Sequence, residues 1–163
     1  AHMQDKGLNI ITGEKVLGFE GRDGLVTTVK STAGDFAADI VVLSIGVRPN
    51  TALAVKAGVE IGTTGAIQVD QHMRTNIEDI FAVGDCAENF NLVTRQPAWY
   101  PMGSTSNKTG RIAGYNVVNK DSMDSLEGVL GTTIVKLFDM NAAKTGLSER
   151  DAKRLGMDVD TVL

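Results

Sequence analysis

Gly84 and Asp85 are the residues whose types and position best suit binding chemistry. They follow a short apolar run, residues 80–83, which is typical of a buried strand. Open α/β sheets bind ligands beyond the carboxyl ends of their strands. At such a place a glycine lets a ligand approach the main chain, and a carboxylate accepts hydrogen bonds from sugar hydroxyls. The alternative is a plain turn in which Asp85 only caps the next segment, and we favour ligand binding.

Arg48 and Pro49 follow a second segment, residues 39–45, which we expect to be a strand covered on both faces because its residues 40–43 are continuously apolar. Pro49 ends that strand because it has no backbone N–H group to donate. Two interpretations of Arg48 are favoured equally. It approaches a bound ligand or an interdomain crevice, or it is a structural salt-bridge partner.

Cys86 is the only cysteine, and it follows Asp85 directly. A thiol that exchanges disulfides needs a second thiol or an activating environment, and the sequence contains no C-x-x-C motif. We therefore expect a packed small side chain. Trp99 and Tyr100 are interpreted as loop packing rather than as a stacking platform. His72 has no suitably spaced partner, so no metal site is expected.

Composition places the chain among ordinary globular proteins. Its 163 residues are 42% hydrophobic, which allows a core of normal size, and the net charge of -4 gives no basic footprint for nucleic acid. No apolar run approaches the roughly 20 residues that a membrane helix needs. The first residues are polar, so we expect no signal peptide, and a single cysteine favours a reducing cytoplasm.

The pattern of the whole chain predicts a mixed α/β structure. Residues 15–20 and 25–31 flank Asp23-Gly24, a hairpin signal, and residues 36–38 complete a small antiparallel meander. Residues 104–119 form the main predicted helix, in which Gly110 and Gly114 share a face and indicate tight packing against a sheet or ligand. Ser104, Thr105 or Ser106 is the predicted cap of this helix. The other predicted helices are residues 1–6, residues 52–57, capped by Asn50 or Thr51 and ended by Gly58, and residues 149–155, capped by Ser148. The other predicted strands are residues 8–12, 65–70, 132–138 and 159–163, and residues 89–101 are a predicted loop.

Three landmarks, in this order, resemble the pyridine nucleotide-disulfide oxidoreductase family. Residues 39–50, which end in Gly46-Val47-Arg48-Pro49-Asn50, are similar to the crossover from the NAD domain back to the FAD domain. The string from Thr75 to Asp85, followed by a helix with Asn107-Lys108-x-Gly110-Arg111, resembles the FAD-binding segment. Residues 131–156 are similar to the opening of the dimerisation domain in the branch of coenzyme A-disulfide reductases, NADH oxidases and NADH peroxidases.

The resemblance implies a fold and its division into parts. The fold is α/β, with part of a Rossmann-like, three-layer FAD/NAD(P)-binding domain, an antiparallel β-meander and the start of an α+β dimerisation domain. Residues 1–38 would end the NAD-binding domain, and residues 39–122 would be the carboxyl-terminal part of the FAD-binding domain. Residues 123–163 would be a linker and the start of the dimerisation domain.

The resemblance also implies FAD and NAD(P)H as cofactors. Gly84 and Asp85 would contact the ribityl chain and pyrophosphate side of FAD. The helix from Ser104 would point its positive amino end at the flavin pyrimidine, with Asn107 and Lys108 as first-turn contacts. The alternative is an ordinary amphipathic helix with a solvated Lys108. Arg48 and Pro49 are the remaining candidates for a flavin contact.

Two features of the family do not occur in this sequence: a G-x-G-x-x-G turn after a strand and a redox cysteine in an amino-terminal helix. We therefore expect an internal fragment, inactive alone, of an enzyme that passes hydride from NAD(P)H to flavin and on to a disulfide, persulfide, peroxide or oxygen acceptor. The alternative is a non-catalytic module that assembles by domain swapping or binds a nucleotide. A homo-oligomer such as a homodimer is expected, with neither nucleic acid nor membrane as partner.

Overall fold

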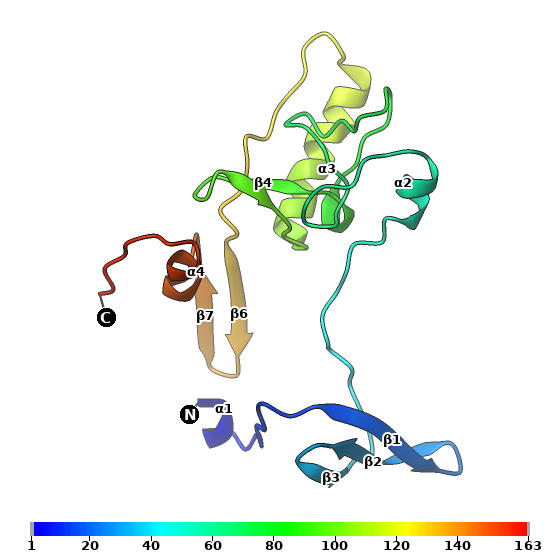
Figure 1. Cartoon of the computed structure of the whole chain (residues 1–163), viewed down its shortest axis with the longest axis vertical. Coiled ribbons are helices and arrows are strands. Elements are labelled where there is room, and N and C mark those ends of the chain that lie inside the picture. Colours follow the sequence, from blue (N-terminus) through cyan, green and yellow to red (C-terminus); the bar gives the residue numbers. More distant parts are fainter. Residues whose placement is uncertain (1, 163) are drawn as a thin grey trace. The chain divides into compact units, whose positions relative to one another are not determined.

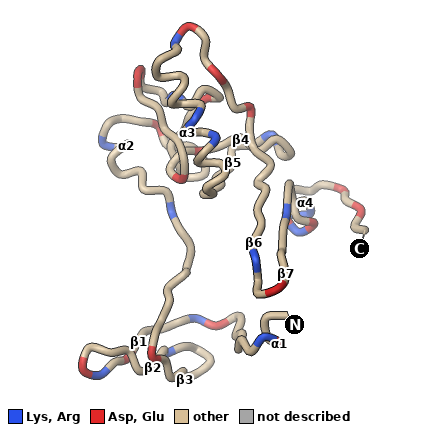
Figure 2. Tube along the Cα trace, turned by 180° about the vertical axis from the view of Figure 1, so that it is seen from behind, with Lys and Arg blue, Asp and Glu red and all other residues tan. Residues whose placement is uncertain are grey.

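The computed structural model describes residues 2–162, and the chain forms two compact units. The first ends at Val47 and the second begins at Arg48 (Figure 1). Acidic and basic residues are interspersed along the trace of each unit (Figure 2). None of the helices in residues 2–162 is long and apolar enough to cross a membrane.

The first unit is a short helix followed by an antiparallel meander, as the sequence predicts. Helix α1 (His2–Asp5) is followed by Gly7, which adopts a φ of +89°. Strands β1 (Val16–Arg22), β2 (Leu25–Ser31) and β3 (Gly34–Ala37) form a sheet in the order β1-β2-β3. Asp23 and Gly24 connect β1 to β2 with φ of +53° and +81°, the left-handed conformation that two-residue hairpin turns require.

Two predicted strands of the first unit are absent from the structure. Residues 8–12 and 40–45 pair with no other strand of the described chain, so both predictions are wrong. Ile40, Val42 and Ile45 are 82, 83 and 92% exposed. A strand is stable only where neighbouring strands take up its N–H and C=O groups, and residues 2–162 provide no such neighbour. The run over residues 40–47 is therefore an uncovered apolar surface.

The second unit begins with helix α2 (Ala52–Lys56), which confirms a predicted helix. Thr51 precedes it without a side-chain capping bond, and Gly58 follows it with a φ of +80°. Glycine is favoured there because a side chain would strain this left-handed conformation. Val59 then enters a small core with Ile67, Ala82 and Ala87.

The predicted strands over residues 65–70 and 80–83 are also wrong as regular strands. Only isolated bridges occur, from Ile67 to Ile61 and Ala87 and from Arg74 to Phe81. Ala82 is buried, as expected for a covered strand, but its segment has a backbone partner on one side only. The apolar pattern predicted burial only in part, since Ile67 and Ala82 are buried whereas Ile80 and Val83 are 37 and 38% exposed. A ladder of backbone bonds would need further strands alongside.

Residues 89–101 contain a hairpin rather than the predicted loop. Strands β4 (Asn89–Asn91) and β5 (Gln96–Ala98) pair antiparallel. Buried Asn91 stabilises their connection, since its Oδ1 atom accepts bonds from the N–H groups of Val93 (2.8 Å) and Thr94 (2.9 Å). Its amide also donates to the Tyr100 hydroxyl. Val129 of the later linker adds to the other edge of β4 through a parallel bridge with Asn91.

Helix α3 (Gly103–Val118) is the longest element and confirms the main predicted helix. It begins after Met102, so none of the three predicted caps, Ser104, Thr105 and Ser106, lies at the cap position. Its buried face, at helical spacing, consists of Thr105, Thr109, Ile112, Ala113 and Asn116. A Cβ atom added to Gly110 or Gly114 would meet no atom of another described segment within 4 Å, so tight packing of these glycines against a sheet is not found. Packing against a ligand stays a prediction.

Asn116 ties α3 to two loops. It is 0% exposed, and its Nδ2 atom donates to the carbonyls of His72 (3.0 Å) and Asp124 (2.9 Å). Its Oδ1 atom accepts a bond from the Asp124 N–H at 2.8 Å. One side chain thereby satisfies three backbone groups, in a place where unpaired polar groups would be costly.

The last part of the chain is a hairpin followed by a helix. Strand β6 (Thr133–Leu137) confirms a prediction, and its antiparallel partner β7 (Met140–Lys144) was not predicted. Ser148 caps helix α4 (Glu149–Arg154) as expected, because its side chain accepts a bond from the Asp151 N–H. The Ser148 hydroxyl also donates to the Asp151 carboxylate and lowers the pKa of Asp151. Residues 159–162 form no strand, contrary to prediction, and Leu163 lies outside the described residues.

Candidate functional site

The Gly84–Asp85 pair lies in a 3-10 turn, η1 (Gly84–Cys86), which packs against α3. Gly84 adopts a φ of +73°, which disfavours any side chain. The Gly84 N–H donates to the Thr109 hydroxyl at 3.1 Å. An added Cβ atom would lie 3.6 Å from Ser106 Oγ, an ordinary contact. Within this chain, therefore, backbone conformation rather than crowding requires glycine at position 84.

Asp85 is exposed, and its carboxylate faces the beginning of α3. Its Oδ1 atom accepts a bond from the Ser106 hydroxyl at 2.8 Å, and no other donor within residues 2–162 bonds to this carboxylate. Its main-chain carbonyl accepts a bond from the Trp99 indole at 2.7 Å. The second carboxylate oxygen is therefore available to a hydroxyl donor from outside the chain.

The amino end of α3 adds a set of unpaired donors. The cap residue Met102 provides no side-chain bond, and the first turn contains no acidic residue. The N–H groups of Gly103 and Ser104 precede the first helical bond, and the helix dipole places partial positive charge there. The site thus combines an acceptor carboxylate with donors that suit an electron-rich group.

Asn107 and Lys108 lie farther along α3 than the sequence predicted. Because the helix begins at Gly103, both belong to its second turn rather than its first, and both are exposed. Lys108 lines a cavity of about 190 Å³ together with Ser104, Thr105 and Thr132. Neither side chain forms a hydrogen bond or ion pair within the described part of the chain.

Arg48 and Pro49 directly precede Asn50, which contacts the turn η1. The Asn50 carbonyl lies 3.6 Å from Cys86 Sγ, which donates to it, so residues 48–50 pass beside η1. Arg48 is exposed and has no ion-pair partner among residues 2–162, although a salt bridge was one of its two interpretations. Cys86 is half-buried against the core around Ala87, in keeping with a packed small side chain.

Sequence reasoning missed three residues that hold the turn: Ser106, Thr109 and Trp99. Ser106 and Thr109 lie three positions apart on α3, the spacing that places two side chains on one face, and that was the one available signal. Trp99 was interpreted as loop packing, and its indole in fact bonds to Asp85.

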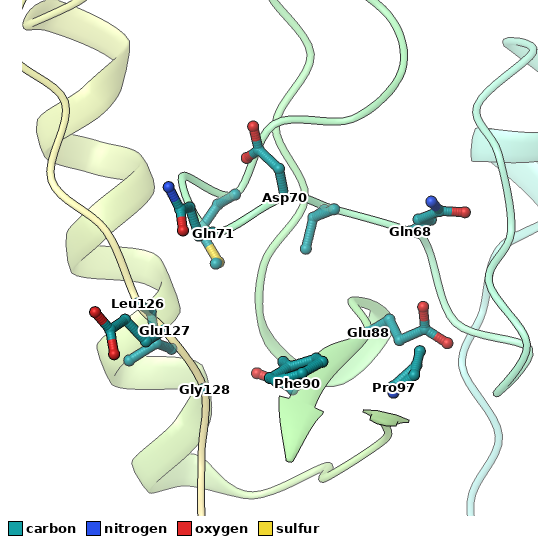
Figure 3. A pocket seen from close by; sticks show the side chains of 12 residues that line it. Gln68, Asp70, Gln71, Glu88, Phe90, Pro97, Leu126, Glu127 and Gly128 are labelled. Atoms are coloured by element: carbon teal, nitrogen blue, oxygen red, sulfur yellow. The ribbon is translucent and has the colours of Figure 1, made fainter. Parts of the chain in front are cut away.

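A second cavity, of about 380 Å³, lies elsewhere in the second unit, and Asp85 does not line it (Figure 3). Asp70, Glu88 and Glu127 project from three different segments around it (Figure 3). Burial alone would raise the pKa of Asp70, but bonds from the Arg74 side chain and from the N–H groups of Arg74 and His72 outweigh it and hold that pKa below its usual value. The Thr64 N–H bonds to Glu88 at 3.0 Å. Two of the three carboxylates are thus already engaged.

Metal-binding side chains were also considered within the described residues. No group of three or more His, Cys, Asp or Glu side chains within the described residues is arranged to hold one.

The chain belongs to the pyridine nucleotide-disulphide oxidoreductase family, whose model matches residues 1–104. It is 41% identical over 154 residues to the CoA-dependent NAD(P)H sulfur oxidoreductase of Pyrococcus furiosus, covering 94% of this chain and 34% of that protein. It is 30% identical over 157 residues to an NADH oxidase of Streptococcus pyogenes, covering 96% of this chain and 34% of that protein.

Solved structures agree with this assignment. An NAD-dependent persulfide reductase from A. fulgidus matches with a TM-score of 0.88 and 40% identity, over 96% of this chain and 28% of that one. This confirms the predicted α/β family fold. The chain spans about a third of the length of the curated relatives that it matches.

Proposed function

We propose that this chain forms one wall of the FAD site of a longer NAD(P)H-dependent oxidoreductase. The observation that carries the proposal is the Asp85 carboxylate, which is exposed and accepts a bond at 2.8 Å from Ser106, a residue of the first turn of α3. The two relatives are each about three times as long as this chain, which supports a FAD site that is completed by residues outside this chain.

The residues present fit FAD chemically. A carboxylate oxygen without an internal partner suits the hydroxyls of the ribityl chain. The N–H groups of Gly103 and Ser104, at the positive end of α3, suit an electron-rich oxygen of the flavin or a phosphate. We propose Gly84, Asp85 and the start of α3 as the main contacts, with Arg48, Pro49, Asn107 and Lys108 at the edge of the site.

When bound, FAD supplies hydride and electron transfer between NAD(P)H and a disulfide, persulfide, peroxide or oxygen acceptor. In this proposal the residues of this chain bind and orient the cofactor and do not receive electrons. Cys86, the sole thiol, donates to the Asn50 carbonyl and has no second thiol as partner. The relatives' names support both sulfur-type and oxygen-type acceptors.

We expect the purified chain to bind FAD reversibly, so that the yellow colour is lost on desalting. The reason is that the sequence has no glycine-rich phosphate turn after a strand to hold the adenine half. NADH consumption with disulfide, persulfide or oxygen as acceptor should stay at background. Retention of one FAD per chain after desalting, or turnover that disappears in Asp85→Ala, would contradict the proposal that the chain is only part of the enzyme.

A second candidate function, assembly with another copy of the chain, is favoured by the uncovered apolar run over residues 40–47. Exposed apolar surface of this kind, on a segment whose backbone has no strand partner, favours strand addition or domain swapping between copies.

We expect sedimentation velocity to show an oligomer, and Ile45→Asp to shift it toward monomer, because a charge would have to be buried in the contact. Val162→Asp is the matched control, since Val162 is equally exposed but lies outside the run. A compact wild-type monomer at tens of micromolar would refute self-association through this run.

A further inference from the structure

The main chain of the turn η1 is held from two sides. The Thr109 hydroxyl, which is buried, accepts the Gly84 N–H bond. Its own proton is directed at carbonyls of its helix, those of Thr105 (3.1 Å) and Ser106 (3.2 Å), so toward Gly84 it can only accept. Trp99 holds the other side through the Asp85 carbonyl. The Cα atom of Asp85 is therefore fixed relative to α3.

The side chain of Asp85 depends on a single contact. An exposed aspartate on a fixed backbone still samples several rotamers. The Ser106 hydroxyl is the only donor to its carboxylate within residues 2–162, and it bonds to Oδ1 at 2.8 Å. This bond favours one rotamer and leaves Oδ2 without a donor among residues 2–162.

We propose that Ser106 is a positioning residue that acts through Asp85, holding the carboxylate in the orientation that accepts a ligand hydroxyl. The inference rests on the proposed function, because a fixed carboxylate helps binding only if a ligand contacts it. Ordering one side chain before binding spares its cost at the moment of binding, so loss of the Ser106 hydroxyl should weaken affinity about two- to tenfold.

The first test uses the ligand-free chain. Three-bond NMR couplings across χ1 of Asp85 should report one rotamer in the wild type and in Ser106→Thr, which keeps the hydroxyl. They should report averaging in Ser106→Ala. Ser125→Ala, in an exposed loop of the same unit, is the control and should match the wild type. Thermal unfolding followed by Trp99 fluorescence verifies that the variants remain folded.

The second test is a double-mutant cycle on FAD affinity, measured by equilibrium dialysis. Ser106→Ala should weaken binding in the wild-type background and have no effect in the Asp85→Ala background. Unchanged couplings in Ser106→Ala, or an equal loss of affinity in both backgrounds, would overturn the positioning role. Altered couplings without any FAD binding by the wild type would support the role of Ser106 and refute the FAD site instead.

Discussion

Replacing Asp85 by alanine is expected to weaken FAD binding by the chain about ten- to a hundredfold. A hydrogen bond to a charged group contributes about 1.5–3 kcal/mol, and each 1.4 kcal/mol changes a dissociation constant about tenfold. Asp85 provides such an acceptor because Ser106 engages only one of its oxygens. Equilibrium dialysis against FAD measures the effect without requiring the complex to survive desalting.

Asp121→Ala is the matched control for this experiment. Asp121 is exposed in the same unit and has no hydrogen bond or ion pair within the described residues, so its removal changes the net charge equally. We expect its dissociation constant to equal that of the wild type. If Asp85→Ala binds FAD as the wild type does, or if both variants lose affinity equally, Asp85 does not contact the cofactor.

Replacing Asn116 by alanine is expected to destabilise the second unit by about 3–5 kcal/mol. The change removes three hydrogen bonds and leaves the His72 carbonyl and the Asp124 N–H without this partner, whereas the Asp124 carbonyl keeps its 2.8 Å contact with His72 Nδ1. Each buried polar group that loses its partner costs about 1–3 kcal/mol. Urea unfolding followed by the fluorescence of Trp99, the only tryptophan and a residue of this unit, measures the loss.

Asn119→Ala is the control at the end of the same helix. Asn119 is only partly buried, and its side chain donates a single bond, to the Tyr115 carbonyl at 2.8 Å. Its loss should cost about 1 kcal/mol or less. Similar urea midpoints for the two variants would show that the Asn116 contacts do not stabilise the second unit as proposed.

Local sequence was sufficient where neighbouring residues decide the conformation. The hairpin at Asp23-Gly24, the cap at Ser148 and the helix end before Gly58 all have the predicted form. Each depends on a left-handed backbone or on a side-chain bond that spans three or four residues. Such contacts form wherever the segment is placed.

Strand predictions failed where the partners are distant or absent. Residues 40–45 and 80–83 have the apolar composition of covered strands, yet the first is exposed and the second has only an isolated bridge. Composition reports the tendency to be buried, whereas a strand also needs another chain segment to complete its hydrogen bonds. Conversely, β7 and the β4–β5 hairpin were missed, although partners close in sequence were available.

The amino-acid sequence by itself identified the family, which the matching family model confirms, and it predicted Gly84–Asp85 as the candidate binding pair, because an apolar run that ends in Gly-Asp is a local pattern. Only the tertiary structure decided how Asp85 is held. Ser106 lies 21 residues further along the chain and Trp99 14, and Thr109 reaches Gly84 from 25 residues away. These bonds depend on the packing of α3 on the turn η1. The residues of either segment alone do not predict that the two segments pack together.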